Sequence, residues 1–83
     1  MPKPPTGFSL AIEFHHEEDG RWLADIPALP GVTAYGPTRK RATVAVQALA
    51  LRLIADRLER GEVVPGPMHV SFVAARETMG SDL

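Results

Sequence analysis

Three histidines are the first candidates for metal ligands in this sequence. His15 and His16 are neighbours, so on a strand their side chains point to opposite faces and cannot bind one ion together. His69 lies far away along the chain, and metal ligands normally converge from elements that hold them in place. We therefore predict exposed histidines near strand ends, with no metal site and no cofactor.

A run of carboxylates, Glu17, Glu18 and Asp19, precedes Gly20. General acid–base or two-metal chemistry needs carboxylates that converge from different elements, whereas neighbours on one turn diverge into water. The chain has no GxSxG, glycine-rich phosphate loop or HExxH motif, so we predict no catalytic residue and no enzymatic activity. Together with Asp25, the three carboxylates are predicted to contact a basic partner, with an ordinary solvated surface as the competing interpretation.

A basic cluster, Arg39, Lys40 and Arg41, follows Thr38. A cation near a helix N-terminus interacts unfavourably with the helix dipole and destabilises the helix by about 0.3–1 kcal/mol. Three such cations in a row therefore suggest that the cluster binds a partner. The cluster could contact nucleic-acid phosphate or the acidic surface of a second copy. Stacking on bases has little support, because Tyr35 is the one aromatic residue near the cluster. Direct nucleic-acid binding is therefore the alternative and not the main prediction.

Composition restricts the class of protein further. The chain has 83 residues, 45% of them hydrophobic and 23% charged, which predicts one folded domain with a thin core. It contains no cysteine, which excludes disulfides, thiolate zinc sites and cysteine nucleophiles. Residues 1–35 hold five acidic and two basic side chains, whereas residues 36–60 hold six basic and two acidic ones. We find neither a signal peptide nor an apolar run of about 20 residues, so we predict a cytoplasmic protein with no membrane contact.

Hydrophobic periodicity predicts the elements that position these residues. Apolar side chains alternate from Phe8 to Phe14, as expected for a strand with one buried face, and no proline or glycine interrupts residues 39–60, which predicts a helix. The predicted order is a flexible lead-in at 1–7, a strand from Phe8, strands at 21–26 and 32–36, a helix at 39–60, a strand at 68–74 and a flexible tail at 75–83. This order indicates a two-layer α+β domain with the helix across one face of the sheet.

Several residues are predicted to shape the connections. Gly20 completes a hairpin turn, Pro27 and Pro30-Gly31 form a rigid corner, and Gly36 and Pro37 end the third strand before Thr38 caps the helix. Trp22 is predicted to contribute core area. The apolar stripe of the helix is wider than one sheet needs, so we also predict self-association.

The stretch from Glu18 through Val32, with Asp19-Gly20, Trp22 and the Ile26-Pro-Ala-Leu-Pro-Gly31 string, continues into Ala34-Tyr-Gly-Pro-Thr38 and Ala42. These residues resemble the N-terminal domain of HicB-like antitoxins over residues 8–74. The resemblance implies a partial ribonuclease H-like fold with sheet order 3-2-1-4 and one helix, in dimers or tetramers. It also implies binding to a small HicA-type toxin that cleaves messenger RNA, with the antitoxin covering the toxin's active site.

Two features depart from that family. Relatives usually carry acidic residues after the capping threonine, whereas this chain has Arg39-Lys40-Arg41. Members that repress their own operon carry a C-terminal DNA-binding domain, and only about nine residues follow the fourth strand here, so we predict no autonomous operator binding. An orphan oligomeric scaffold, with nucleic acid bound at the basic cluster, is the alternative function.

Overall fold

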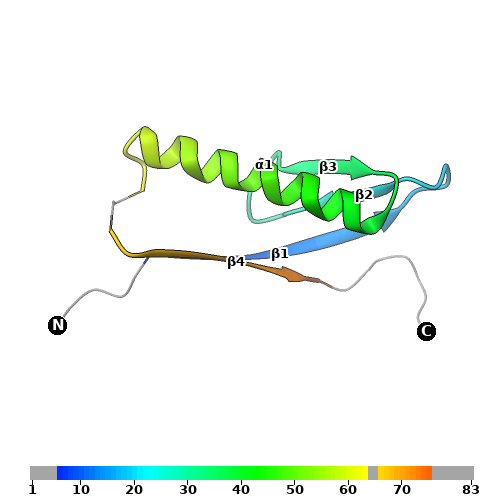
Figure 1. Cartoon of the computed structure of the whole chain (residues 1–83), viewed down its shortest axis with the longest axis horizontal. Coiled ribbons are helices and arrows are strands. Elements are labelled where there is room, and N and C mark those ends of the chain that lie inside the picture. The colour runs from blue at the N-terminus through cyan, green and yellow to red at the C-terminus, as the bar shows by residue number, and fades with distance from the viewer. Residues whose placement is uncertain (1–5, 64–65, 76–83) are drawn as a thin grey trace.

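A computed structural model describes residues 6–63 and 66–75. It is an α+β fold in two layers, a four-stranded mixed sheet and one long helix (Figure 1). The elements are β1 (Thr6–His16), β2 (Trp22–Asp25), β3 (Thr33–Gly36), α1 (Arg39–Glu59) and β4 (Met68–Ala74). The sheet order is β3-β2-β1-β4, which confirms the predicted fold class and strand order.

The sheet register places the apolar residues of successive strands on one face. β1 pairs antiparallel with β2, with Phe14 opposite Ala24, and parallel with β4, with Leu10 opposite Phe72. Because side chains alternate along a strand, the even-numbered residues of all these strands share the face toward α1. Leu10, Ile12 and Phe14 on that face are buried, as the alternation predicted.

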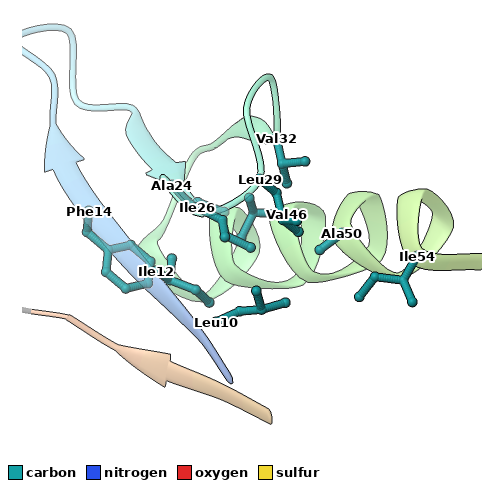
Figure 2. Packing of buried hydrophobic residues seen from close by; sticks show 11 residues of the cluster. Leu10, Ile12, Phe14, Ala24, Ile26, Leu29, Val32, Val46, Ala50 and Ile54 are labelled. Atoms are coloured by element: carbon teal, nitrogen blue, oxygen red, sulfur yellow. The ribbon is translucent and has the colours of Figure 1, made fainter. Parts of the chain in front are cut away.

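The core lies between this face and one stripe of α1 (Figure 2). The buried residues of the helix recur every fourth position: Ala42, Val46, Ala50 and Ile54. Two of the four are alanines, and short side chains let a helix approach a sheet closely. Gly36 in β3 belongs to the same contact, because a Cβ there would lie 2.5 Å from the backbone nitrogen of Ala42.

The corner between β2 and β3 supplies core residues as well as a change of direction. The Ile26 amide donates to the Val32 carbonyl at 3.1 Å, and the Val32 amide donates to the Leu29 carbonyl at 3.0 Å. These hydrogen bonds close a compact loop that buries Ile26, Leu29 and Val32, while Pro27 and Pro30 stay exposed. Gly20 and Gly31 both have positive φ, 91° and 87°, as turn residues often require. The predicted corner and hairpin turn are thus present, although burial of Leu29 was not predicted.

Both ends of α1 agree with their sequence signals. The Thr38 hydroxyl accepts a hydrogen bond from the Arg41 amide at 3.1 Å, so Thr38 is the N-cap. At the other end Arg60 is the C-cap, and the Gly61 and Glu62 amides donate back to the Leu58 and Arg57 carbonyls. This pair of bonds is a Schellman motif, which ends the helix at a glycine as predicted.

The strand boundaries differ from the prediction by one or two residues. β1 begins at Thr6, so Thr6 and Gly7 belong to the sheet and not to the predicted lead-in, because they pair with Met68 and His69 of β4. Ala75, placed in the predicted tail, donates its amide to the Ile12 carbonyl at 2.7 Å. Residues 1–5 and 76–83 of the predicted lead-in and tail lie outside the described residues.

Candidate functional site

The predicted acidic surface begins at the turn between β1 and β2. The Glu17 amide donates to the Arg21 carbonyl at 2.8 Å, and the Gly20 amide donates to the Glu17 carbonyl at 3.0 Å, which fixes the turn. Glu18 and Asp19 are exposed at its tip, and Glu17 is half-buried. These three carboxylates therefore lie together at one end of the sheet.

Asp19 differs from its two neighbours because it already has a cationic partner. Its carboxylate accepts from the Arg21 amide at 3.0 Å and from the Arg21 Nε at 2.7 Å. The backbone amide of Arg21, followed by its guanidinium, lowers the pKa of Asp19 below the ordinary value for an aspartate. The charge of Asp19 is therefore balanced by Arg21 within the hairpin, so Asp19 attracts a basic partner less strongly than an unpaired carboxylate would.

Asp25 is not part of the turn cluster. It lies at the far end of β2, on the face of the sheet opposite α1, and the Thr33 hydroxyl donates to its Oδ1 at 2.9 Å. Its partner in the register is Glu13 of β1, which shares that outer face. Sequence reasoning missed the pairing of Glu13 with Asp25, although their odd positions in adjacent antiparallel strands place both on the outer face.

The outer face carries a second cluster beside these acids. The Arg21 guanidinium lies over the Tyr35 ring at 4.3 Å, and Leu23 pairs with Tyr35 in the register between β2 and β3. The side chain of Tyr35 is 48% exposed. The outer face therefore combines carboxylates with a stacked arginine–tyrosine pair, and arginine and tyrosine are both enriched at protein interfaces.

The three side chains of the basic cluster do not face the same part of the surface. The Arg39 guanidinium lies over the Phe14 ring at 4.4 Å, and Arg39 and Lys40 line a groove of about 490 Å³ between α1 and the sheet. Arg41 is exposed and does not line this groove. The remaining lining residues are Ile12, Phe14, Thr43, Gln47, Phe72 and Ala74. The groove therefore has an apolar floor and a partly basic wall.

His16 and Trp22 form part of the scaffold, while His69 lies exposed on β4. His16 stacks on Trp22 with ring centroids 4.4 Å apart and an interplanar angle of 9°. Trp22 is half-buried and packs against the core, so it contributes part of its area to the core as predicted. Within residues 6–63 and 66–75, no three histidine, aspartate or glutamate side chains are grouped so that they could hold a metal ion.

Taken together, the described side chains form surfaces suited to binding: an acidic turn, an outer face with Glu13 and Asp25, and a groove beside the basic start of α1. Across the described part of the chain, no helix is both long and apolar enough to span a membrane. No protein-family model matches the sequence, and no curated protein or solved structure matches it either.

Proposed function

We propose that this chain is a HicB-like antitoxin domain, which binds and occludes a small HicA-type toxin that cleaves messenger RNA in the cytoplasm. The observation that supports the proposal most is the sheet order β3-β2-β1-β4 with one helix after β3, the arrangement that the sequence resemblance implied. The activity is stoichiometric binding, in which no covalent bond is made or broken.

The acidic residues supply the attraction in this proposal. A protein that cleaves RNA must bind phosphate and is therefore basic near its active site, so a complementary acidic surface increases the rate and selectivity of association. Asp19 is already paired with Arg21, so we assign the attraction to Glu17 and Glu18 at the turn and to the Glu13–Asp25 pair on the outer face. Salt should weaken the complex because exposed charges are screened.

The proposal includes self-association into a dimer or tetramer. Val44, Leu51 and Leu58 of α1 remain 60%, 47% and 39% exposed, so part of the apolar surface of the helix is not used by the core. A domain of this size without disulfides gains stability when such surface is covered by another copy.

A second function has support from one observation, the groove at the start of α1. Arg39 and Lys40 line this groove together with the half-buried Phe72, so cations and an aromatic ring are close together, whereas Phe14 is buried beneath the Arg39 guanidinium. That combination is used to bind single-stranded nucleic acid. An oligomeric scaffold that binds RNA at the groove is therefore the alternative to the antitoxin.

Growth rescue tests the antitoxin proposal directly. The product of the reading frame next to this one is expressed alone and together with this chain, and growth is recorded. We expect growth arrest by the neighbour alone and recovery on co-expression. A neighbour whose toxicity persists with this chain folded and present at equal or higher amounts would contradict the proposal.

The acidic surfaces are tested by neutralising them in the same assay. The variant E13Q/E17Q/E18Q/D25N should lose rescue and should bind the toxin at least tenfold more weakly at low salt. The matched control E59Q/E62Q changes exposed carboxylates at the other end of the molecule and should retain both. Equal rescue by the two variants, with both folded by circular dichroism, would rule out the assigned surface.

The scaffold alternative is tested with a fluorescent single-stranded RNA. Wild-type chain and the R39A/K40A/R41A variant are titrated at several salt concentrations. A salt-dependent affinity that the triple variant loses would favour the alternative, and indistinguishable binding curves would remove it.

A further inference from the structure

The two edges of the sheet are built differently. β3, at one edge, has four residues, is followed by Pro37 and lies against α1 through the close contact of Gly36 with Ala42. β4, at the other edge, has seven residues and is preceded by Pro67, and none of the seven is an acidic residue, lysine, arginine or proline. Folded proteins normally protect a sheet edge with short length, charge, proline or a covering element. Among the described residues β3 has a short length, a flanking proline and the covering helix, whereas the longer β4 has only a flanking proline (Figure 1).

The backbone of β4 has hydrogen-bonding groups directed away from the molecule. The Ala75 amide donates to the Ile12 carbonyl of β1 at 2.7 Å. Backbone groups of a strand alternate in direction, so Ser71 and Val73 also face β1. The amides and carbonyls of Val70 and Phe72 then face outward, where no element of the described residues pairs with them. Such a row is satisfied by water or by another strand.

We propose that β4 pairs antiparallel with β4 of a second copy of this chain, about a two-fold axis that passes next to Ser71. The two sheets then become one continuous sheet, with both helices on the same face. This inference rests on the self-association proposed above and is independent of toxin binding. It assigns the dimer contact to β4, and leaves the exposed apolar side chains of α1 for a contact between dimers.

The register follows from the strand itself. Ser71 is the midpoint of Met68–Ala74, so an axis there uses the whole strand. Val70 then lies opposite Phe72 of the partner subunit, and both have outward-facing backbone groups that form a hydrogen-bonded pair. Ser71 lies opposite Ser71 of the partner subunit in a pair without backbone hydrogen bonds, where the Cα atoms are about 4.5 Å apart. The pairing therefore satisfies the outward-facing groups of both strands.

Charge and packing favour a second copy as the occupant. β4 carries no acidic residue, lysine or arginine, so two copies meet without repulsion between like charges near neutral pH. Met68, Val70 and Phe72 are half-buried on the face toward α1, and pairing with the same residues of a partner extends this apolar layer. Met68 of the partner subunit would lie opposite Ala74, which lines the groove together with Phe72. A flexible methionine side chain suits such an irregular position.

Disulfide crosslinking tests the register. The chain has no cysteine, so each variant carries a single thiol. S71C should form a covalent dimer on mild oxidation, because its Cα separation across the axis lies within the range of about 4.4–6.8 Å that a disulfide spans. The matched control is S9C, since Ser9 is also exposed on the outer face but lies on β1, beside Ser71. The two thiol-bearing positions of an S9C dimer would be about 14 Å apart, from three strand spacings of about 4.8 Å, and should not crosslink.

A charge at the edge tests the interface without touching the core. Val73 is 54% exposed on the outer face, and V73K should weaken the dimer at least tenfold in sedimentation equilibrium, because lysine on an edge strand opposes pairing. V44K places the same charge at a similarly exposed valine of α1 and tests the other apolar surface of the chain; pairing through β4 predicts that the dimer persists in V44K.

Three results would overturn the inference: a wild-type chain that sediments as a monomer at micromolar concentration, a dimer in which S71C does not crosslink, or a dimer that V44K dissociates and V73K does not. The last result would place the interface on the helix. Rescue from the toxin is measured separately with V73K, so failure of the dimer and failure of the antitoxin proposal give different readouts.

Discussion

The two halves of the sheet bury the side chains on their α1-facing side to different extents. Beneath α1, in the β2–β3 half, Ala24 and Ile26 have no exposed surface. In β4 the residues on the same face, Val70 and Phe72, are only half-buried. The difference shows the limit of a single helix: residues of β1 and β2 on the face toward α1 are buried, whereas those of β4 are only partly covered.

The contact between β3 and α1 should be the most sensitive point of the covered half. Gly36→Ala places a Cβ 2.5 Å from the Ala42 nitrogen, and because the obstacle is backbone it cannot rotate away. We expect a loss of about 3 kcal/mol in unfolding free energy, the upper end of the usual range for overpacking. Urea unfolding measures this loss. A loss below about 0.5 kcal/mol, the scale of neutral surface changes, would show that the helix is not held this closely.

The stability contributed by each half can be compared by truncating one valine in each. Val32 is buried in the corner beside β3, and Val70 is half-buried in β4. Val32→Ala should destabilise by about 2 kcal/mol and Val70→Ala by about 1 kcal/mol, in proportion to the apolar area each buries. Both are measured by urea unfolding in the V73K background, so that dimerisation does not contribute. Equal losses of unfolding free energy for the two substitutions would contradict the claim that the β4 half is less completely buried.

Removing the N-cap of α1 should have a smaller effect on the unfolding free energy. Thr38→Ala removes the acceptor for the Arg41 amide and should destabilise the chain by about 1 kcal/mol, whereas Thr38→Ser should retain most of the stability. Thermal or urea unfolding of the pair distinguishes loss of the cap from loss of the methyl group. If Ser and Ala destabilise equally, the hydroxyl does not cap the helix.

The smallest expected effect is at the hairpin turn, and it depends on pH. Because folding lowers the pKa of Asp19, its interaction with Arg21 stabilises the fold above the pKa of the unfolded chain. This stabilisation disappears as the pH falls through the lower pKa of the folded chain. Asp19→Asn should therefore be slightly less stable than wild type near neutral pH and equal to it in strong acid. A difference that persists unchanged in strong acid would contradict this origin.

Local sequence signals were sufficient for the elements and their order. Alternation at Phe8–Phe14, the cap at Thr38 and the stop at Gly61 each depend on a few neighbouring residues, and the structure confirms them. Burial of Leu29 could not be predicted in the same way. It depends on how the corner folds back under α1, which hydrogen bonds between Ile26, Leu29 and Val32 determine.

The candidate site was harder to predict because charge along the sequence does not give position in space. The sequence predicts that Asp25 belongs with the acidic residues of the turn, yet the register pairs it with Glu13 on the outer face. The sequence predicts one cluster of three equivalent cations, yet the Arg39 guanidinium lies over the Phe14 ring, and Arg41 does not line the groove. In both cases the deciding contact joins residues from different elements.

Hydrogen exchange at the edge strand is the most direct test of the central claim, that the covered half is complete in one chain and the β4 half is completed by a second copy. The amides of Val70 and Phe72 are followed at low and high protein concentration, with Ala24 as an internal reference and V73K as a control. We predict that protection of Val70 and Phe72 rises with concentration in the wild type alone, while Ala24 stays equally protected. Exchange at Val70 and Phe72 that is independent of concentration would contradict the account.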